Sequence, residues 1–215
     1  FFDTEVNIAA MLLRQIQISH EARVATATFA ANGLTAISAT QAYTEANITS
    51  FNVPGDVAAA KLELAKYGVM PNTLVMSQPV FERIRRSNFV QNQFFGVVAT
   101  NQSRLLNEAE VAAACGVDRV LVGRGAKNTA KKGQPYAGGF LWSNTYLALC
   151  NTVGGDFAGG GFGRTIIWAA DSPVPFVSET YRDEARRADV LRVRQNSTEK
   201  VIDGSSIIRI TTGFA

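Results

Sequence analysis

The sequence predicts an α+β fold, and three observations support this prediction. Residues 3–31 contain neither proline nor glycine, which allows one long helix. Residues 56–124 alternate short helical patterns with apolar strands, and residues 176–212 alternate apolar and polar side chains by twos. The chain of 215 residues is 47% hydrophobic and 18% charged, so it is long and apolar enough to bury a sizeable core.

The first predicted element is a helix from Asp3 to Ala31, roughly 40 Å long at 1.5 Å per residue. Asp3 or Thr4 is a suitable N-cap, and Asn32-Gly33 supplies a left-handed stop. The polar side chains form one narrow strip, and apolar residues cover most of the remaining circumference. The strip consists of Asp3, Arg14, Gln17 and Glu21, and the apolar residues are Ile8, Met11, Leu12, Leu13, Ile16, Ile18, Ala22, Val24, Ala25 and Phe29.

A helix that is apolar on most sides needs neighbours on most sides. Two interpretations follow: a central core helix of an ordinary domain, or a strut covered partly by its own chain and partly by other copies. We expect one flank of residues 3–31 to contact a neighbouring subunit, because few monomeric helices are apolar over so much of their surface.

The middle of the chain is predicted to form short helices and strands with short connections, as is typical of an α/β or α+β lobe. Ser77 is expected to cap the helix at 80–86. Asn107 and Glu110 have the spacing of a capping box at the start of the helix at 107–115. The expected elements are a connecting segment with a short strand at 34–51, helices at 56–67, 80–86 and 107–115, strands at 73–76 and 118–124, an irregular segment at 87–100 anchored by Phe89, Phe94 and Phe95, a polar loop at 125–139, and two short strands or one bent strand at 140–150.

The last part of the chain is predicted to be β-structure that follows a glycine loop. Residues 151–163 contain six glycines, and a strand is expected at 165–168. Residues 176–194 and 200–212 then alternate by twos, with a turn at Asp203-Gly204. Alternating strands joined by tight turns predict an antiparallel β meander.

The sequence offers little that is typical of an active site. The loop at 154–163 resembles a phosphate cradle, but it lacks the Lys-Ser/Thr of a P-loop and precedes a strand, so we interpret it as a tip between strands. His20 is the only histidine, and its position within an apolar helix predicts a partly buried, hydrogen-bonded side chain. Cys115 and Cys150 lie in apolar surroundings and are expected to be buried free thiols. We therefore predict no enzyme, no cofactor and no metal site.

Two charged segments have simple interpretations. The carboxylates near residue 183 lie beside arginines, which predicts mutual pairing. Lys127, Lys131 and Lys132 form a basic loop near Tyr136, which we expect to be solvated because a single-strand-binding surface needs more aromatic side chains. The net charge of +3 permits weak, non-specific contact with nucleic acid. No apolar run is long enough to cross a bilayer, so no membrane partner is expected.

Several segments, in this order, resemble the major capsid proteins of tailed bacteriophages, whose shells use the Hong Kong ninety-seven type fold. The likeness spans residues 21–212 and depends on the shared order more than on any one motif. The segments are Glu21-x-Arg23-Val24-Ala25, Tyr67-Gly68-x-x-Pro71-Asn72-Thr73-Leu74-Val75-Met76-Ser77, Val80-Phe81, Val120-Leu121-Val122-Gly123, Lys127-Asn128-Thr129-Ala130-Lys131-Lys132-Gly133, Glu179-Thr180-Tyr181-Arg182-Asp183-Glu184 and Val190-x-Arg192-Val193-Arg194.

The resemblance implies a division into three parts. Residues 1–51 would be the spine helix and a connecting segment of the peripheral lobe, residues 52–170 an axial lobe of mixed sheet and helices, and residues 171–215 the peripheral β meander. Such proteins normally carry an N-terminal arm and an extended hairpin before the spine helix. This sequence begins almost on the helix, with Phe-Phe rather than Met, so we expect a segment upstream that was cleaved, omitted or not ordered.

The resemblance also implies a function as a self-assembling shell protein. Copies would form the hexamers and pentamers of an icosahedral shell around double-stranded DNA, in a virion capsid assembled in the host cytoplasm, with scaffolding, portal or decoration proteins as further partners. The residues expected at subunit interfaces are Arg14, Gln17, Glu21, Gly159, Gly160, Gly161, Arg182, Asp183, Glu184, Arg186 and Arg187. Two alternatives stay open: a bacterial nanocompartment shell protein of the same fold, and a small α+β nucleotide-binding enzyme that uses the 154–163 loop.

Overall fold

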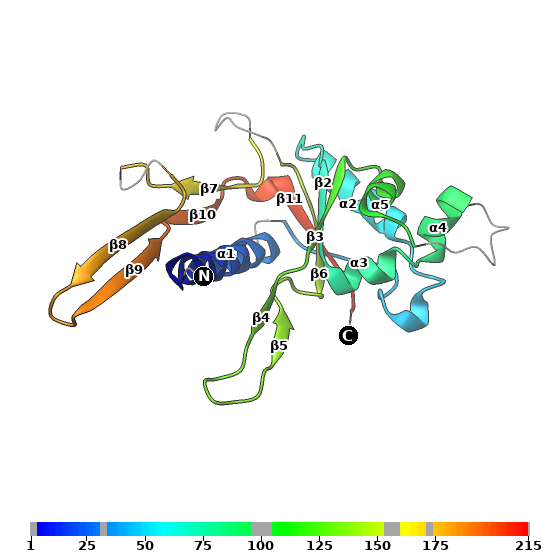
Figure 1. The fold of residues 1–215 in the computed structure, drawn as a ribbon. Coiled ribbons are helices and arrows are strands. Elements are labelled where there is room, and N and C mark those ends of the chain that lie inside the picture. The colour runs from blue at the N-terminus through cyan, green and yellow to red at the C-terminus, as the bar shows by residue number, and fades with distance from the viewer. Residues whose placement is uncertain (1–3, 31–33, 96–104, 153–159, 171–173, 215) are drawn as a thin grey trace.

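The computed structural model describes residues 4–30, 34–95, 105–152, 160–170 and 174–214. Within these ranges the predicted α+β class is confirmed: helices flank a mixed five-stranded sheet, and three two-stranded ribbons extend from it (Figure 1). None of the helices in these ranges is both long and apolar enough to span a bilayer.

Helix α1, Thr4–Phe29, confirms the long helix predicted at the start of the chain. Its C-terminal end is buried at Ala25, Thr28 and Phe29, whereas its N-terminal half is largely exposed. The predicted stop at residues 32–33 lies outside the described residues.

The central sheet has the strand order β1-β11-β6-β2-β3. β1 runs parallel to β11, β2 runs parallel to β3, and β6 is antiparallel to both β11 and β2. The short strand expected at 34–51 and the strands expected at 73–76 and 118–124 are thereby confirmed. The strands are β1 Ile37–Ser38, β2 Thr73–Ser77, β3 Arg119–Gly123, β6 Tyr146–Cys150 and β11 Ile207–Thr211.

The period of two along each strand divides the sheet into two apolar faces. One face carries Leu74, Leu149 and Ile208 into the main core, which the short helices cover. The opposite face carries Val75 and Ala148, together with Cys150 and Ile207, against Phe29 of α1. The fully buried strand β2 therefore reads as a continuous apolar run because it is covered on both sides.

The predicted helix starts have different outcomes. Ser77 stands at the N-cap of α3, but its hydroxyl donates to Oδ1 of Asn144 at 2.7 Å and does not cap the helix. Asn107 and Glu110 form a complete capping box at the start of α5, and Gly116 ends that helix in the left-handed conformation. Lys61 of α2 donates hydrogen bonds to the carbonyls of Cys115 and Gly116, at 2.8 and 2.5 Å. The helices are α2 Val53–Ala65, α3 Gln78–Ile84, α4 Asn88–Phe95 and α5 Glu108–Cys115, and one-turn 3-10 helices cover Glu45–Asn47 and Gly204–Ser206.

The irregular segment predicted at 87–100 is wrong for its first part, which forms α4. The amide of Gln91 donates to the carbonyl of Ser87, and Val90 is fully buried in the main core. Phe89, one of the expected anchors, is exposed, so Val90 fixes this helix instead. The side chains of Phe94 and Phe95, the other two expected anchors, lie outside the described residues. A helix this short is marginal on its own and depends on tertiary contacts, which the sequence does not display.

The polar loop predicted at 125–139 is also wrong, because the chain there forms a β-hairpin. Strand β4, Ala126–Asn128, pairs antiparallel with β5, Gly138–Phe140. The sequence lacks the alternation of a half-buried strand because both strands are largely exposed. The two short strands or one bent strand predicted at 140–150 are confirmed only in part: β6 occupies 146–150, and β5 reaches this range only at Phe140.

The single β meander predicted at 171–215 is wrong in its pairing. β8, Val177–Asp183, pairs with β9, Ala188–Arg194, whereas β10, Ser197–Val201, pairs with β7, Gly163–Ile167. The predicted turn at residues 203–204 does not close a hairpin. Asp203 instead accepts hydrogen bonds from the amide and hydroxyl of Ser205, which turns the chain toward β11 in the central sheet. The division at 1–51, 52–170 and 171–215 stays a prediction.

Candidate functional site

Helix α1 is partly covered by the rest of the chain and partly exposed. Its side chains contact the central sheet through β6 and the outer strands β9 and β10, so the helix joins these two parts of the molecule (Figure 1). Toward the N-terminus of α1 its apolar side chains are no longer buried: Val6, Ile8 and Met11 are 61%, 44% and 73% exposed. Large apolar side chains in this state are typical of an interaction surface.

A single carboxylate, Glu199 on β10, holds the covered half of α1. Its Oε1 lies 2.6 Å from Nδ1 of His20, and Arg23 donates from Nε to Oε2 at 2.7 Å and from Nη2 to Oε1 at 3.1 Å. Arg23 is steadied in turn by a bond to the hydroxyl of Ser19, one turn earlier. The two α1 residues lie on adjacent turns because they are three positions apart. His20 is thus hydrogen-bonded and partly buried, as predicted.

The electrostatics of this cluster follow from its geometry. The hydrogen bonds from Arg23 lower the pKa of Glu199 to about 2, against the opposing effect of burial, and the bond with His20 adds to the lowering. Glu199 in turn raises the pKa of Arg23. The Glu199 side chain is 9% exposed, so its charge is shielded from water and directed at α1.

A second attachment joins α1 to the root of the β4–β5 hairpin. Nε1 of Trp142 donates to Oε1 of Glu21 at 2.7 Å, and the Trp142 ring meets Phe29 edge to face with centroids 5.6 Å apart. The same ring lies so close to Gly123 that a Cβ there would stand 2.1 Å from it. Glycine at position 123 therefore leaves room for the Trp142 ring.

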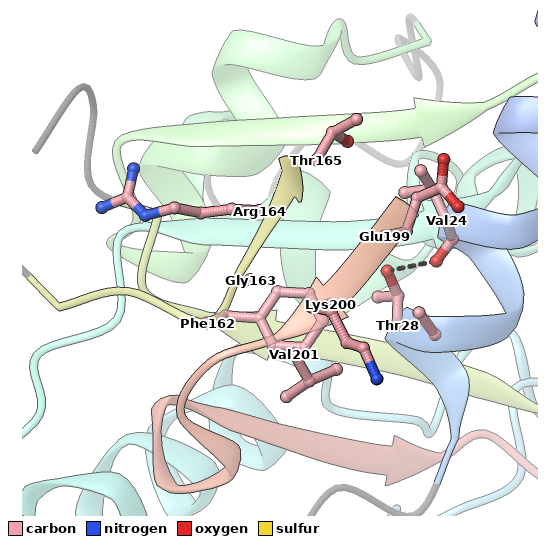
Figure 2. Close-up of a pocket in the computed structure, with 10 residues that line it drawn as sticks. Val24, Thr28, Phe162, Gly163, Arg164, Thr165, Glu199, Lys200 and Val201 are labelled. Carbon is pink, nitrogen blue, oxygen red and sulfur yellow. Dashed lines mark hydrogen bonds between the residues drawn. The ribbon is translucent and has the colours of Figure 1, made fainter. Parts of the chain in front are cut away.

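Beside the Glu199 cluster lies a half-open cavity of about 120 Å³ between α1 and the β7–β10 ribbon (Figure 2). Val24, Phe162 and Val201 give it apolar walls. The Thr28 hydroxyl on its rim donates to the carbonyl of Val24 at 2.8 Å and so is already used within the helix. The cavity presents no histidine or cysteine, and the described part of the chain contains no cluster of metal-binding side chains.

The predicted interface residues on α1 have different surroundings. Arg14 and Gln17 are exposed, in agreement with a polar strip that faces outward. Glu21 is half-buried and occupied by Trp142, so it acts within the chain. These assignments leave Arg14 and Gln17 as the strip residues available to a neighbour.

The predicted glycine site is described only at its end. Gly159 lies outside the described residues, whereas Gly160 and Gly161 have φ of 72° and 102° and lead directly toward β7. The carbonyl of Gly160 accepts a hydrogen bond from Arg164 at 3.2 Å. Because a strand follows, no helix N-terminus directs its amides at a phosphate here.

The charged residues of the β8–β9 hairpin pair with one another, as predicted. Arg182 reaches Glu184 at 2.8 Å and Asp189 at 3.5 Å, and Arg186 reaches Asp183 at 3.6 Å. Arg187 stands in the turn with φ of 49°. These residues form the far end of the hairpin in Figure 1, well separated from the glycine residues before β7.

The structure therefore does not gather the predicted interface residues into one site. They occupy α1, the approach to β7, and the tip of β8–β9. The sequence reasoning missed Glu199 and Trp142, which hold α1 in position. Glu199 is 179 residues from His20, and no local pattern links two residues at that separation.

Comparisons with known proteins agree with a phage-capsid-like fold. A phage-related protein from Bordetella bronchiseptica RB50 superimposes with a TM-score of 0.72 at 17% identity, covering 95% of this chain and 65% of that one. A "putative capsid protein of prophage" from E. coli CFT073 gives 0.53 at 12% identity, covering 92% and 63%. The chain thus spans just under two thirds of either structure. No protein-family model and no curated protein matches the sequence. What the chain shares with these two phage structures is its fold.

Proposed function

We propose that the chain is the shell subunit of a tailed-bacteriophage head of the Hong Kong ninety-seven type. In this proposal its copies form hexamers and pentamers around double-stranded DNA, in a virion capsid assembled in the host cytoplasm. The protein is structural and carries out no catalysis. The likeness in fold to two phage structures supports the proposal.

The observation that carries the proposal is the uncovered half of α1. Val6, Ile8 and Met11 of this helix are exposed to water. Burying their apolar surface would contribute a stabilising free energy of roughly 25 cal/mol for each Å². In a closed shell every subunit has neighbours related by symmetry, so a second copy covers this surface in the same way at every position. The attachment of the C-terminal half of α1 through Glu199 and Trp142 holds the helix on the rest of the chain, so that each copy would present the same surface.

Electron micrographs of the purified protein test the proposal. We expect closed particles of uniform size, and double-stranded DNA inside particles recovered from producing cells. Particles that hold an enzyme instead would identify a nanocompartment shell. A protein that stays monomeric and binds nucleotides in equilibrium dialysis would overturn the proposal in favour of the glycine-loop alternative.

The proposal also names further partners. Scaffolding, portal or decoration proteins would accompany the shell, and co-purification from infected cells identifies them. Binding of the chain to a specific DNA sequence at physiological salt is not expected, because the net charge of +3 supports only weak, salt-sensitive contact.

A further inference from the structure

The β4–β5 hairpin is a basic projection that the proposed function leaves unused. It extends away from the central sheet beside α1 (Figure 1), and Lys127, Lys131 and Lys132 are all exposed on it. None of the three makes an ion pair within the described residues. Residues 119–155 contain no aspartate or glutamate, so nothing nearby in sequence offsets their charge.

The hairpin holds these lysines in an ordered arrangement. Oδ1 of Asn128 accepts the amides of Ala130 and Ala137, each at 3.0 Å, and thereby closes the loop from both sides. The amide of Thr129 donates to the carbonyl of Ala137 at 2.8 Å, and that of Gln134 to Lys131 at 3.0 Å. An ordered loop loses less conformational entropy on binding than a loose one.

The root of the hairpin is fixed as well. The amide of Leu141 donates to the carbonyl of Gly125 at 2.9 Å, where the ladder of β4 and β5 ends. The next residue, Trp142, donates a hydrogen bond to Glu21 of α1 at 2.7 Å. The lysines are therefore carried at a set position relative to the spine of the molecule.

We propose that this hairpin, through Lys127, Lys131 and Lys132, is the site at which the chain contacts the phosphate backbone of duplex DNA. Lysines provide phosphate contacts without base specificity, and an exposed tyrosine such as Tyr136 is a further phosphate donor. Single-stranded nucleic acid needs a succession of stacking aromatics, which the hairpin lacks. The proposed function enters only in naming the nucleic acid that the hairpin meets.

A second copy of the chain is a poorer match for this surface. Among the described residues, the exposed carboxylates without an ion pair are Glu5 and Asp118, on separate elements. Two isolated charges do not make an acidic surface that complements three lysines on one hairpin. A polyanion with evenly spaced phosphates does.

The test is the salt dependence of binding to a short, mixed-sequence duplex, followed by fluorescence anisotropy. The variant combines Lys127→Gln, Lys131→Gln and Lys132→Gln. The control removes the same charge elsewhere by Lys66→Gln, Arg86→Gln and Arg192→Gln, all at exposed positions outside the hairpin. Circular dichroism checks that both remain folded.

We expect the hairpin variant to bind more weakly and its plot of log K against log salt to be shallower by about 2.7, since each phosphate contact contributes about 0.9 to the slope. The control keeps most of the wild-type slope. Equal losses in both variants, no binding by the wild type at low salt, or an unchanged hairpin variant would overturn the inference. Loss of particles with unchanged DNA binding would do so too, because the hairpin would then meet a second copy.

This result is separable from the proposed function. If particles form but their DNA binding does not depend on the hairpin, the inference is wrong and the proposed shell function is unaffected. If the chain forms no particles but its DNA binding depends on the hairpin, the inference holds and the proposed shell function is wrong.

Discussion

At the scale of single residues, two carboxylates join segments that are separate in the sequence. Glu199 fastens α1 to β10 through His20 and Arg23. Asp56, at the start of α2, is buried and accepts hydrogen bonds from Thr40 and Tyr43. Hydrogen bonds to an ionised carboxylate are stronger than neutral ones, so each group can fix its partners firmly.

Glu199 makes stability depend on pH in the acid range. Its pKa is about 2 when folded and 4.5 when free, so the stability it contributes is present above pH 4.5 and is lost as the pH falls toward 2. In Glu199→Gln we expect a Tm about 2–4 °C lower at pH 7, which corresponds to about 1 kcal/mol, and a smaller decline below pH 4.5. Thermal scans from pH 7 to 2 measure this, with Asp118→Asn as the exposed control. Parallel curves for Glu199→Gln and the wild type would contradict the account.

Tyr43 donates to Oδ2 of Asp56 at 2.9 Å, and burial raises the pKa of its phenol. Tyr43→Phe removes one donor from a buried carboxylate, so we expect a loss of about 1.5–3 kcal/mol in the free energy of unfolding. Urea titration measures it. Tyr67→Phe, at an exposed position, is the matched control and should change little. Equal effects of the two substitutions would show that the hydrogen bond to Asp56 contributes nothing to the free energy of unfolding.

At the scale of elements, the sequence predicts what depends on near neighbours. The helix α1, the capping box of α5 and the strand β2 follow from residues within a few positions of one another. The helix α4 and the hairpin β4–β5 do not. Val90 of α4 is buried in the main core among residues distant in sequence, and both strands of the hairpin are largely exposed. The pairing of β10 with β7 could not be predicted either, because the alternation of apolar and polar residues marks a strand without identifying its partner.

The candidate site shows the same limit. The exposure of Arg14 and Gln17 and the pairing at the β8–β9 tip follow from spacing and neighbouring charges. The contacts Glu199–Arg23 and Trp142–Glu21 join residues more than a hundred positions apart, so they became visible only in the fold.

The tip of the β8–β9 hairpin should matter more for assembly than for folding. Arg186 is 82% exposed and reaches only Asp183, at 3.6 Å, among the described residues. Such a pair contributes about 0–1 kcal/mol to a subunit, whereas like charges across an interface cost several kcal/mol, and a shell repeats the cost at every copy. We expect Arg186→Glu to keep the wild-type circular dichroism and Tm and to lower particle yield, with partial recovery at high salt.

Particle yield by light scattering measures this effect. Arg186→Gln, which removes the charge without reversing it, separates repulsion from loss of the pair. Normal yield of Arg186→Glu at low salt would return the hairpin to a simpler role, in which its charges protect an exposed edge from aggregation.

At the scale of the whole molecule, α1 lies against both the central sheet and the outer strands. The central sheet packs on its C-terminal end through Phe29, and the outer strands hold it through Glu199. Its N-terminal half then extends with apolar side chains in water. The central claim of the proposed function is that a second copy of the chain covers this apolar surface.

Sedimentation velocity over a series of protein concentrations tests that claim most directly, with two substitutions of exposed methionines. Met11 lies on α1, and Met70 lies in the connection between α2 and β2. We expect the wild type and Met70→Glu to sediment as large assemblies and Met11→Glu as a folded monomer of about 23.1 kDa. A wild type that stays monomeric at every concentration, or a Met11→Glu variant that assembles as fully as Met70→Glu, would contradict the account.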